Sequence, residues 1–212
     1  MIAACRKPDE APGLQALQCR RLSAVSLDVR HEGSVAELVE ELGATPIDVL
    51  VKNAGVWGGV HQDLERMDYA GWLEAFKVNT LGPYRVSTAL VAHLSRSSNP
   101  RIVTLSSQMG SLSRQSTGSY GYRSSKAAVN KVMQVLALEL RDKGIIVCPV
   151  HPGWVRTEMG GGEADISVEE SAQGLVSLID RLTMEHSGRF WVVRPPGRTL
   201  AAHLSRPSTR RS

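Results

Sequence analysis

Short runs of β-branched and aliphatic residues alternate with longer stretches of helical spacing along most of this chain. The short runs end at glycine, proline, serine or charged residues, as buried strands do. They are Ile2–Cys5, Val25–Val29, Ile47–Val51, Arg101–Leu105, Ile145–Val150 and Arg189–Val193. The helical stretches are Ser34–Leu42, Asp68–Leu94, Tyr120–Asp142 and Ser167–Leu182. Strands that alternate with helices predict an α/β fold, a doubly wound parallel sheet with helices on both faces.

Local signals mark the boundaries of these helices. Ser167 has Glu170 three residues further on, which is the spacing of a capping box. Gly43 follows the first helical stretch as a C-terminal cap. Inside the long stretch, Gly82–Pro83 predicts a bend, because proline cannot donate to the preceding turn.

The charge distribution divides the chain near residue 193. Residues 1–193 are long enough for one domain with a sizeable core. Residues 194–212 hold five arginines and no acid, whereas the rest of the chain has 20 basic and 21 acidic residues. We therefore expect a basic, disordered tail over 194–212. The domain itself lacks the basic excess typical of a nucleic-acid-binding face, so no nucleic-acid partner is expected for it.

The cysteine count and the hydropathy indicate the compartment. Cys5, Cys19 and Cys148 are odd in number and form no Cys-x-x-Cys pair, which favours a reducing compartment without a disulfide framework or zinc. The histidines lack metal-like spacing, so no metal site is predicted. No apolar run reaches about eighteen residues, and Met1–Cys5 is too short for a signal-peptide core. We expect a cytoplasmic protein with no membrane partner.

Tyr122 and Lys126 are the strongest candidates for chemistry. They stand four residues apart at the start of a helical stretch, so they lie one turn apart on one face. A free tyrosine has a pKa of about 10, and a cation at roughly 4–6 Å lowers it. Such a phenol suits proton delivery to a carbonyl oxygen. Tyr120 falls on another face. Alone, the pair also fits a surface lysine beside a tyrosine at a helix start.

Polar or glycine-rich residues follow the predicted strands, and ligands bind at the carboxyl ends of open parallel sheets. The strand ends carry Arg6, Asp28, Asn53-Ala54-Gly55, Ser106-Ser107 and Pro152-Gly153. Each also fits an ordinary turn. Their joint occurrence around one tyrosine–lysine pair favours a binding site.

With these motifs in this order, the chain resembles the short-chain dehydrogenase/reductase family from about residue 2 to residue 191. The resemblance rests on Asn53-Ala54-Gly55, Val78-Asn79-Thr80, Ser106-Ser107, Tyr122-x-x-x-Lys126 and Pro152-Gly153-Trp154-Val155-Arg156-Thr157. Three stretches are similar to the C-factor-like or sniffer-like carbonyl reductase subgroup: Tyr122–Asn130, His151–Thr157 and Ser187–Trp191.

The resemblance implies an NADP-dependent oxidoreductase that reduces a small carbonyl compound or oxidises the alcohol. Tyr122 would be the general acid or base, and Lys126 would lower its pKa and bind the nicotinamide ribose. Ser107 would orient the substrate; we prefer it to Ser106 because the family's serine is usually the second of the pair. Asn79, in a bulge of the long helix, would support a water-linked proton relay to Lys126.

The resemblance also implies a cofactor site. The adenine would contact Asp28 and Val29, and the adenosine side would be lined by Asn53, Ala54 and Gly55. The nicotinamide carboxamide would be held by Pro152, Gly153, Val155 and Thr157. Arg6, followed by Lys7 with no acid before Asp9, favours the 2′-phosphate of NADP over NAD. Two solvated cations are the alternative explanation.

The chain departs from the family at its start. The family's first strand and Gly-x-x-x-Gly-x-Gly turn, which holds a pyrophosphate at a helix N-terminus, have no counterpart here. We therefore expect an N-terminally truncated Rossmann-like domain with weakened cofactor binding. The absent strand belongs between the strands at 2–5 and 47–51, so the sheet must close over the gap, borrow a strand or stay loose. Lys52 also replaces the asparagine that usually precedes Asn53.

Three functional hypotheses follow. The first is the reductase, expected as a homodimer because the two long helices pair across subunits in the family. The second is a catalytically silent relative that acts as a structural or partner-binding subunit. The third is nucleic-acid binding by the arginine-rich tail. For the reductase, Trp154 is expected to form a wall of the substrate pocket.

Overall fold

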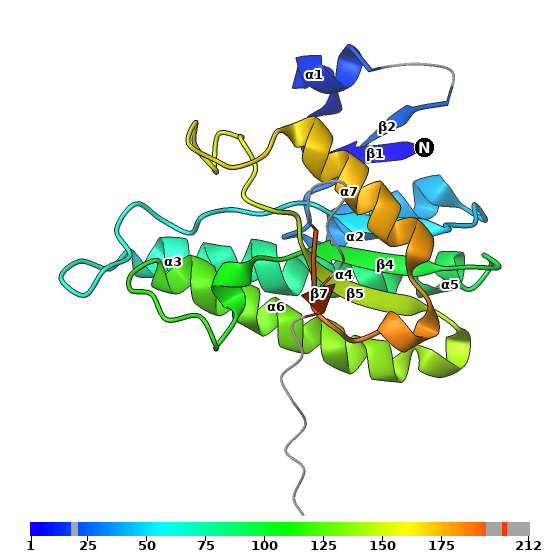
Figure 1. Ribbon diagram of the computed structural model, residues 1–212. Helices are drawn as coiled ribbons and strands as arrows, with labels where there is room; N and C mark the ends of the chain where they lie inside the picture. Colours follow the sequence, from blue (N-terminus) through cyan, green and yellow to red (C-terminus); the bar gives the residue numbers. More distant parts are fainter. Residues whose placement is uncertain (18–20, 194–200, 203–212) are drawn as a thin grey trace, which may run out of the picture.

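A computed structural model of the chain describes residues 1–17, 21–193 and 201–202. Its strands form two sheets (Figure 1). The smaller sheet pairs β1 (Ile2–Cys5) with β2 (Ser23–Ser26) in parallel. The larger sheet has, in order, β3 (Val49–Lys52), β4 (Arg101–Leu105), β5 (Ile146–His151), β6 (Trp191–Val192) and β7 (Ala201–Ala202). All its pairings are parallel except β6 with β7.

Helices cover both faces of the larger sheet, as the alternation of strands and helices predicts. α6 (Tyr120–Glu139) packs on one face, where Met133 and Leu136 meet Ile102 of β4 and Val147 of β5. α7 (Val168–Arg181) lies on the opposite face (Figure 1), where Leu178 belongs to a separate buried cluster. Every residue of β5 is buried. The predicted doubly wound α/β fold is confirmed.

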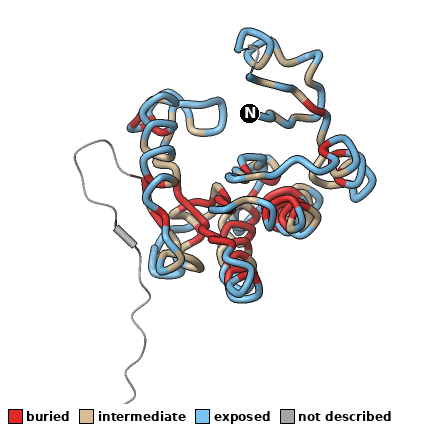
Figure 2. Tube along the Cα trace, turned by 90° about the vertical axis from the view of Figure 1, so that its right-hand side faces the viewer, coloured by how far each residue is buried: buried red, intermediate tan, exposed pale blue. Residues whose placement is uncertain are grey.

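The smaller sheet, with η1 (Pro8–Glu10) and α1 (Pro12–Gln15), stands apart from this body; we call residues 1–31 the N-terminal lobe. Figure 2 shows its tube coloured mostly as exposed, whereas red segments gather in the larger sheet and its helices. α2 (Glu32–Leu42) joins the two parts, because Val35 and Leu38 pack with Val25 of β2 and with Val86 and Leu90. The sheet was expected to close over the gap, borrow a strand or stay loose; among the described residues it neither closes nor borrows a strand, and the strands are divided between two sheets.

The long helical stretch is interrupted where a bend was predicted. α3 (Tyr69–Phe76) leads into a π-helical turn η2 (Lys77–Leu81), and α4 (Gly82–Ala89) and α5 (Val91–Leu94) follow. A π-helical turn inserts an extra residue and widens the helix locally. Asn79 sits in the middle of this turn, so the predicted bulge is present.

Other helix boundaries agree with the local signals. The side chain of Ser167 accepts from the Glu170 amide at 3.1 Å, and the Glu170 carboxylate accepts from the Ser167 amide at 2.7 Å, so the predicted capping box is confirmed. α6 is shorter than predicted, because the separate turn η4 (Arg141–Lys143) follows it. The remaining short helices are η3 (Gln108–Gly110) and η5 (Met184–His186).

The predicted tail, 194–212, lies outside the described residues apart from Ala201 and Ala202 of β7, as does Cys19. Proposals about the tail, including nucleic-acid binding, therefore stay predictions. Among the helices that the structure describes, none combines the length and apolar character needed to cross a membrane.

Candidate active site

The predicted pair is close together near the start of α6. Lys126 Nζ lies 5.7 Å from the centroid of the Tyr122 ring. Lys126 is buried, its Nζ donates to the Leu105 carbonyl at 2.9 Å, and burial lowers its pKa to about 8. Tyr120 lies elsewhere, since it is exposed and its ring is 6.2 Å from that of Trp72. The structure therefore places Tyr122, and not Tyr120, beside the amine.

The predicted lowering of the Tyr122 pKa is wrong, because the net shift goes in the opposite direction. Burial raises the pKa of Tyr122, and a hydrogen bond with Ser107 only partly opposes that rise. The ammonium group is directed to the Leu105 carbonyl, and its own pKa is lowered, so burial dominates at the phenol. In this structure Tyr122 is therefore held in its protonated form at neutral pH.

The two serines that follow β4 have different environments. Ser106 is directed to α6, where its hydroxyl donates to Asn130 Oδ1 at 2.6 Å. Ser107 Oγ accepts from the Met109 amide at 3.1 Å, which leaves its own hydrogen free to be donated. Because Ser107 is also the serine that interacts with Tyr122, the geometry supports the choice of Ser107.

Asn79 connects the bulged helix to the segment after β3. Its amide accepts from the Val56 N–H at 2.9 Å and donates to the Val56 carbonyl at 2.9 Å and to Ser125 Oγ at 3.0 Å. A Cβ on Gly55 would lie 3.4 Å from Asn79 Oδ1 and 3.6 Å from Lys126 Nζ. Asn79, Gly55 and Lys126 therefore meet at one point, but the relay from Asn79 to Lys126 stays a prediction.

The loop after β5 holds the residues predicted to bind the carboxamide. β5 neighbours β4, and the Ser106 amide donates to the Val150 carbonyl at 2.7 Å, so this loop begins beside the serines. Gly153 has a φ of 95°, and a Cβ there would lie 2.4 Å from Ile166 Cδ1. Thr157 Oγ1 accepts from the Gly160 amide at 3.1 Å, which folds the loop back on itself. The Pro152 carbonyl accepts from Ser171 of α7, and Val155 bridges to Ile166.

The residues predicted for the adenosine end are spread over both sheets. Asn53 and Ala54 are exposed at the end of β3. Asp28 follows β2, where Arg30 binds its carboxylate through Nε at 2.9 Å and holds the pKa of Asp28 well below its usual range. Val29 packs near Gly82 of α4. Arg6 is exposed at the end of β1, on the other sheet from Lys126.

Sequence reasoning missed the aromatic residue that touches Tyr122. The Trp57 ring stacks on the Tyr122 ring with centroids 4.6 Å apart and an interplanar angle of 23°. Trp154, the predicted pocket wall, is exposed, and its Nε1 donates to the Gly160 carbonyl at 2.8 Å. The position of Trp57, two residues after Gly55, was the available signal, because Gly55 lies beside Lys126.

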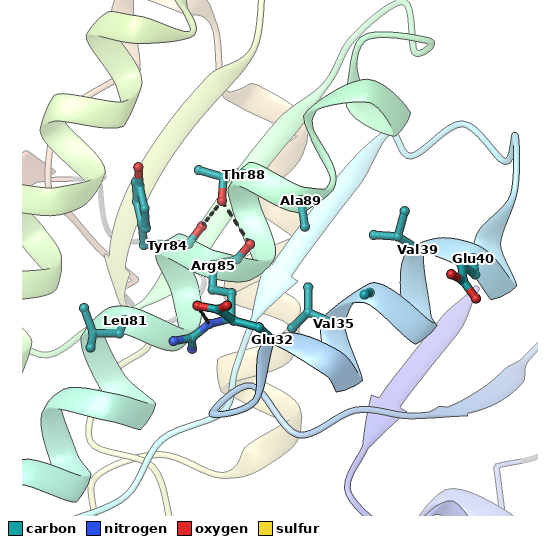
Figure 3. Close-up of a pocket in the computed structure, with 10 residues that line it drawn as sticks. Glu32, Val35, Val39, Glu40, Leu81, Tyr84, Arg85, Thr88 and Ala89 are labelled. Carbon is teal, nitrogen blue, oxygen red and sulfur yellow. Dashed lines mark hydrogen bonds and ion pairs between the residues drawn. The ribbon is translucent and has the colours of Figure 1, made fainter.

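A shallow groove of about 710 Å³ lies elsewhere, between α2 and α4 (Figure 3). Val35 and Val39 of α2 line one side of it, and Arg85 and Ala89 of α4 line the other. None of the predicted site residues lines this groove. Within the described part of the chain, no group of three or more His, Cys, Asp or Glu side chains could hold a metal ion.

Comparisons with known proteins point to one family. The family model described as short chain dehydrogenase matches residues 2–165. Among curated proteins, C-signal of Myxococcus xanthus is 42% identical over 147 residues, which cover 69% of this chain and 88% of that protein.

Two solved structures are similar over most of their length. Carbonyl reductase Sniffer of D. melanogaster has a TM-score of 0.86 and 25% identity, covering 92% of this chain and 85% of that one. A carbonyl reductase of Pseudomonas aeruginosa PAO1 in complex with NADP has a TM-score of 0.79 and 36% identity, covering 92% and 86%.

Proposed function

The chain belongs to the short-chain dehydrogenase family, and on that premise we propose that it is an NADP-dependent reductase of a small carbonyl compound. One observation carries the proposal: the half-buried Tyr122 phenol, whose pKa is raised, lies beside the Ser107 hydroxyl and near the Lys126 amine. A protonated phenol is the form that reduction of a carbonyl requires.

In the proposed reaction, Ser107 donates a hydrogen bond to the carbonyl oxygen and Tyr122 donates the proton that this oxygen takes up. Lys126 then stabilises the phenolate, because its ammonium group lies 5.7 Å from the centroid of the Tyr122 ring. NADPH, when bound, supplies the hydride. In the reverse direction, the phenolate would take the proton of the alcohol.

The residues present fit the nicotinamide end of this cofactor. Lys126 Nζ has three hydrogens, of which one is donated to the Leu105 carbonyl, so the amine can also bind ribose hydroxyls. Gly55 leaves room directly beside this amine. Pro152, Gly153, Val155 and Thr157 would hold the carboxamide.

The residues present fit the adenosine end of the cofactor less completely than its nicotinamide end. Arg6, exposed after β1, would bind the 2′-phosphate, which suits NADP and agrees with the NADP found in the P. aeruginosa carbonyl reductase. Asp28, Val29, Asn53 and Ala54 would line the adenine and its ribose. The sequence has no Gly-x-x-x-Gly-x-Gly turn for the pyrophosphate, so we expect weak binding by this chain.

We further propose a cytoplasmic homodimer that pairs through the long helices. Large apolar side chains are exposed on these elements, namely Tyr69, Leu73, Leu81, Tyr84, Val135 and Leu138. Such a surface favours burial against a second copy.

The test is NADPH oxidation with a panel of aldehydes and ketones. Tyr122→Phe should lower kcat at least about 100-fold, because the proton donor is lost while the ring remains. Tyr120→Phe is the matched control, since Tyr120 is exposed and should keep full activity. Equal activity of wild type and Tyr122→Phe would refute the catalytic role.

The divided sheet supports a second candidate function, a catalytically silent subunit that binds a partner. Among the described residues, β3 pairs only with β4, and its Val49 and Val51 are 37% and 45% exposed. A strand edge of this kind can pair with a strand of another protein. Titration with NADPH separates the candidates, because micromolar binding by the isolated chain argues against the silent subunit.

A further inference from the structure

Gln62 is a buried polar residue that the chemistry above does not use. It lies in the loop between β3 and α3, and 6% of its surface is exposed. Its amide nevertheless makes three hydrogen bonds, to groups on two different elements. A buried amide with its donors and its acceptor all in use fixes the groups that it joins.

One side of Gln62 binds the start of α6. The first amides of a helix lack partners inside the helix and need capping groups. The N-cap residue, Ser119, has a φ of 54° and no capping bond from its own side chain. Gln62 supplies two of the missing acceptors: its main-chain carbonyl accepts from the Ser119 amide at 2.9 Å, and its Oε1 accepts from the Tyr122 amide at 3.1 Å.

The other side of Gln62 binds the loop that carries Trp57. Its Nε2 donates to the Trp57 carbonyl at 3.0 Å and to the Gly59 carbonyl at 3.2 Å. The Trp57 ring in turn stacks on the Tyr122 ring at 4.6 Å. The same amide therefore binds the backbone of Tyr122 and the backbone of Trp57, whose ring stacks on the Tyr122 ring.

Glycines make this close contact possible. A Cβ on Gly121 would lie 3.0 Å from Gln62 Oε1 and 3.3 Å from the Gly58 carbonyl. Gly58 has a φ of 94°, and a Cβ there would lie 2.6 Å from Ala75 Cβ. The backbones of the loop, of α3 and of the start of α6 are thus packed so closely that little room is left for a Cβ at these glycines. This packing leaves the Gln62 amide little freedom to move.

We propose that Gln62 is a positioning residue of the reductase site: by tying the start of α6 to the Trp57 loop, it fixes the Tyr122 phenol relative to Ser107 and to the substrate. This inference rests on the proposed function, because it assigns Gln62 a role through Tyr122. Gln62 itself does not touch the reacting atoms.

Two substitutions separate the two sides of the amide. Gln62→Glu keeps an acceptor for the Tyr122 amide but, while ionised, has no donor for the carbonyls of Trp57 and Gly59. Protonation of the new carboxyl restores one donor. Gln62→Met is similar in length but has neither the donors nor the strong acceptor.

The experiment measures kcat and KM for the carbonyl substrate and for NADPH between pH 5.5 and 8. Gln173→Glu and Gln173→Met are the controls, because Gln173 is an exposed residue of α7. We expect both Gln62 variants to lose roughly 10- to 100-fold in kcat at pH 8, with the KM for NADPH unchanged, as misplacement of a catalytic group does. Gln62→Glu should regain activity relative to wild type as pH falls, and Gln62→Met should not.

A second readout keeps this test separate from that of the proposed function. Tyr122 ionisation is followed by tyrosinate absorbance, as the difference between each protein and its Tyr122→Phe counterpart. Both Gln62 variants should lower the Tyr122 pKa at least partly towards 10, because a loosened Trp57 loop admits water to the phenol. If the wild type reduces no carbonyl, the function fails while this titration still tests Gln62.

Two results would overturn the inference. One is an unchanged kcat and Tyr122 titration in both folded Gln62 variants. The other is an identical pH profile for Gln62→Glu and Gln62→Met, which would mean that only packing is lost. Should Gln62→Met fail to fold, the pH profile of Gln62→Glu against wild type decides the question alone.

Discussion

The two sheets of this protein are built from similar strands and differ in how they are covered. In β1 of the N-terminal lobe no residue is fully buried, and Ile2 is 42% exposed. In β4 and β5 of the larger sheet the apolar residues are buried, except Leu105, which is partly buried. The smaller sheet and strands β3 to β6 of the larger sheet are parallel, and parallel strands normally lie between two layers of helices. In the described part of the chain, only the larger sheet has both layers.

Because of this difference, the residues of the candidate site are divided between a well-packed part of the protein and a part with few buried contacts. Tyr122, Lys126 and Ser107 stand on elements of the larger sheet and its helices. Arg6 and Asp28 stand on the N-terminal lobe, which α2 and a few polar contacts join to the body. The proposed chemistry and the proposed cofactor recognition would therefore depend on parts of the molecule with different expected stabilities.

The largest expected effect compares one isoleucine in each sheet. Ile102→Ala should destabilise the fold by about 2–5 kcal/mol, because it leaves a cavity in a fully buried cluster. Ile2→Ala, in the exposed β1, should cost less than about 1 kcal/mol. Urea unfolding followed by circular dichroism measures both. Equal losses would show that the two sheets are equally well packed.

Replacement of a buried lysine in the larger sheet should have the opposite effect and stabilise the fold. Lys52 at the end of β3 is 7% exposed, contacts Ser87 Oγ and lies 3.5 Å from Met133 Sδ, and burial lowers its pKa well below 10.5. Lys52→Met should therefore stabilise the larger sheet by about 1–3 kcal/mol at pH 7. Lys131→Met, an exposed change on α6, should have little effect.

The stabilisation by Lys52→Met should depend on pH. The folded chain holds Lys52 neutral at pH values where the unfolded chain still protonates it, so wild-type stability rises with pH up to about 10.5. The advantage of Lys52→Met should shrink over the same range. Urea unfolding at pH 7, 9 and 10.5 measures it, and a constant advantage would contradict a neutral buried amine.

The smallest expected effect concerns the polar contact between the N-terminal lobe and α3. Arg30 NH1 donates to Glu74 Oε1 at 3.0 Å while the same side chain holds Asp28. Glu74→Gln should cost less than about 1 kcal/mol globally, because the pair is partly exposed. It should nevertheless speed amide exchange in β1 and β2 relative to β4 and β5. Glu37→Gln on α2 is the control, and unchanged exchange would exclude this contact as a support of the lobe.

Much of the fold could be predicted because its signals are local. The run at 101–105 and the capping box at Ser167 need only neighbouring residues to be recognised, and both agree with the structure. The boundary of β2 could not be read from composition. Leu27 and Val29 continue the apolar pattern, but pairing in β2 ends at Ser26, where the chain turns towards α2.

The site was predictable in part for the same reason. The spacing of Tyr122 and Lys126 gives their common helix face, but the Tyr122 pKa depends on how deeply the ring is buried, and burial is set by distant segments. Trp57 and Gln62 reach Tyr122 across about sixty residues of sequence. No periodicity reports a contact of that kind, so sequence reasoning overlooked both residues.

The open side of β3 also bears on how the protein behaves at high concentration. No strand of the described residues pairs with this side of β3, and Val49 and Val51 are exposed on one face; a strand edge of this kind is a template for aggregation. We therefore expect solubility to be limited by intermolecular strand pairing at β3, and not by melting of the core. A charged gatekeeper such as Val51→Lys would improve solubility without disturbing the buried clusters.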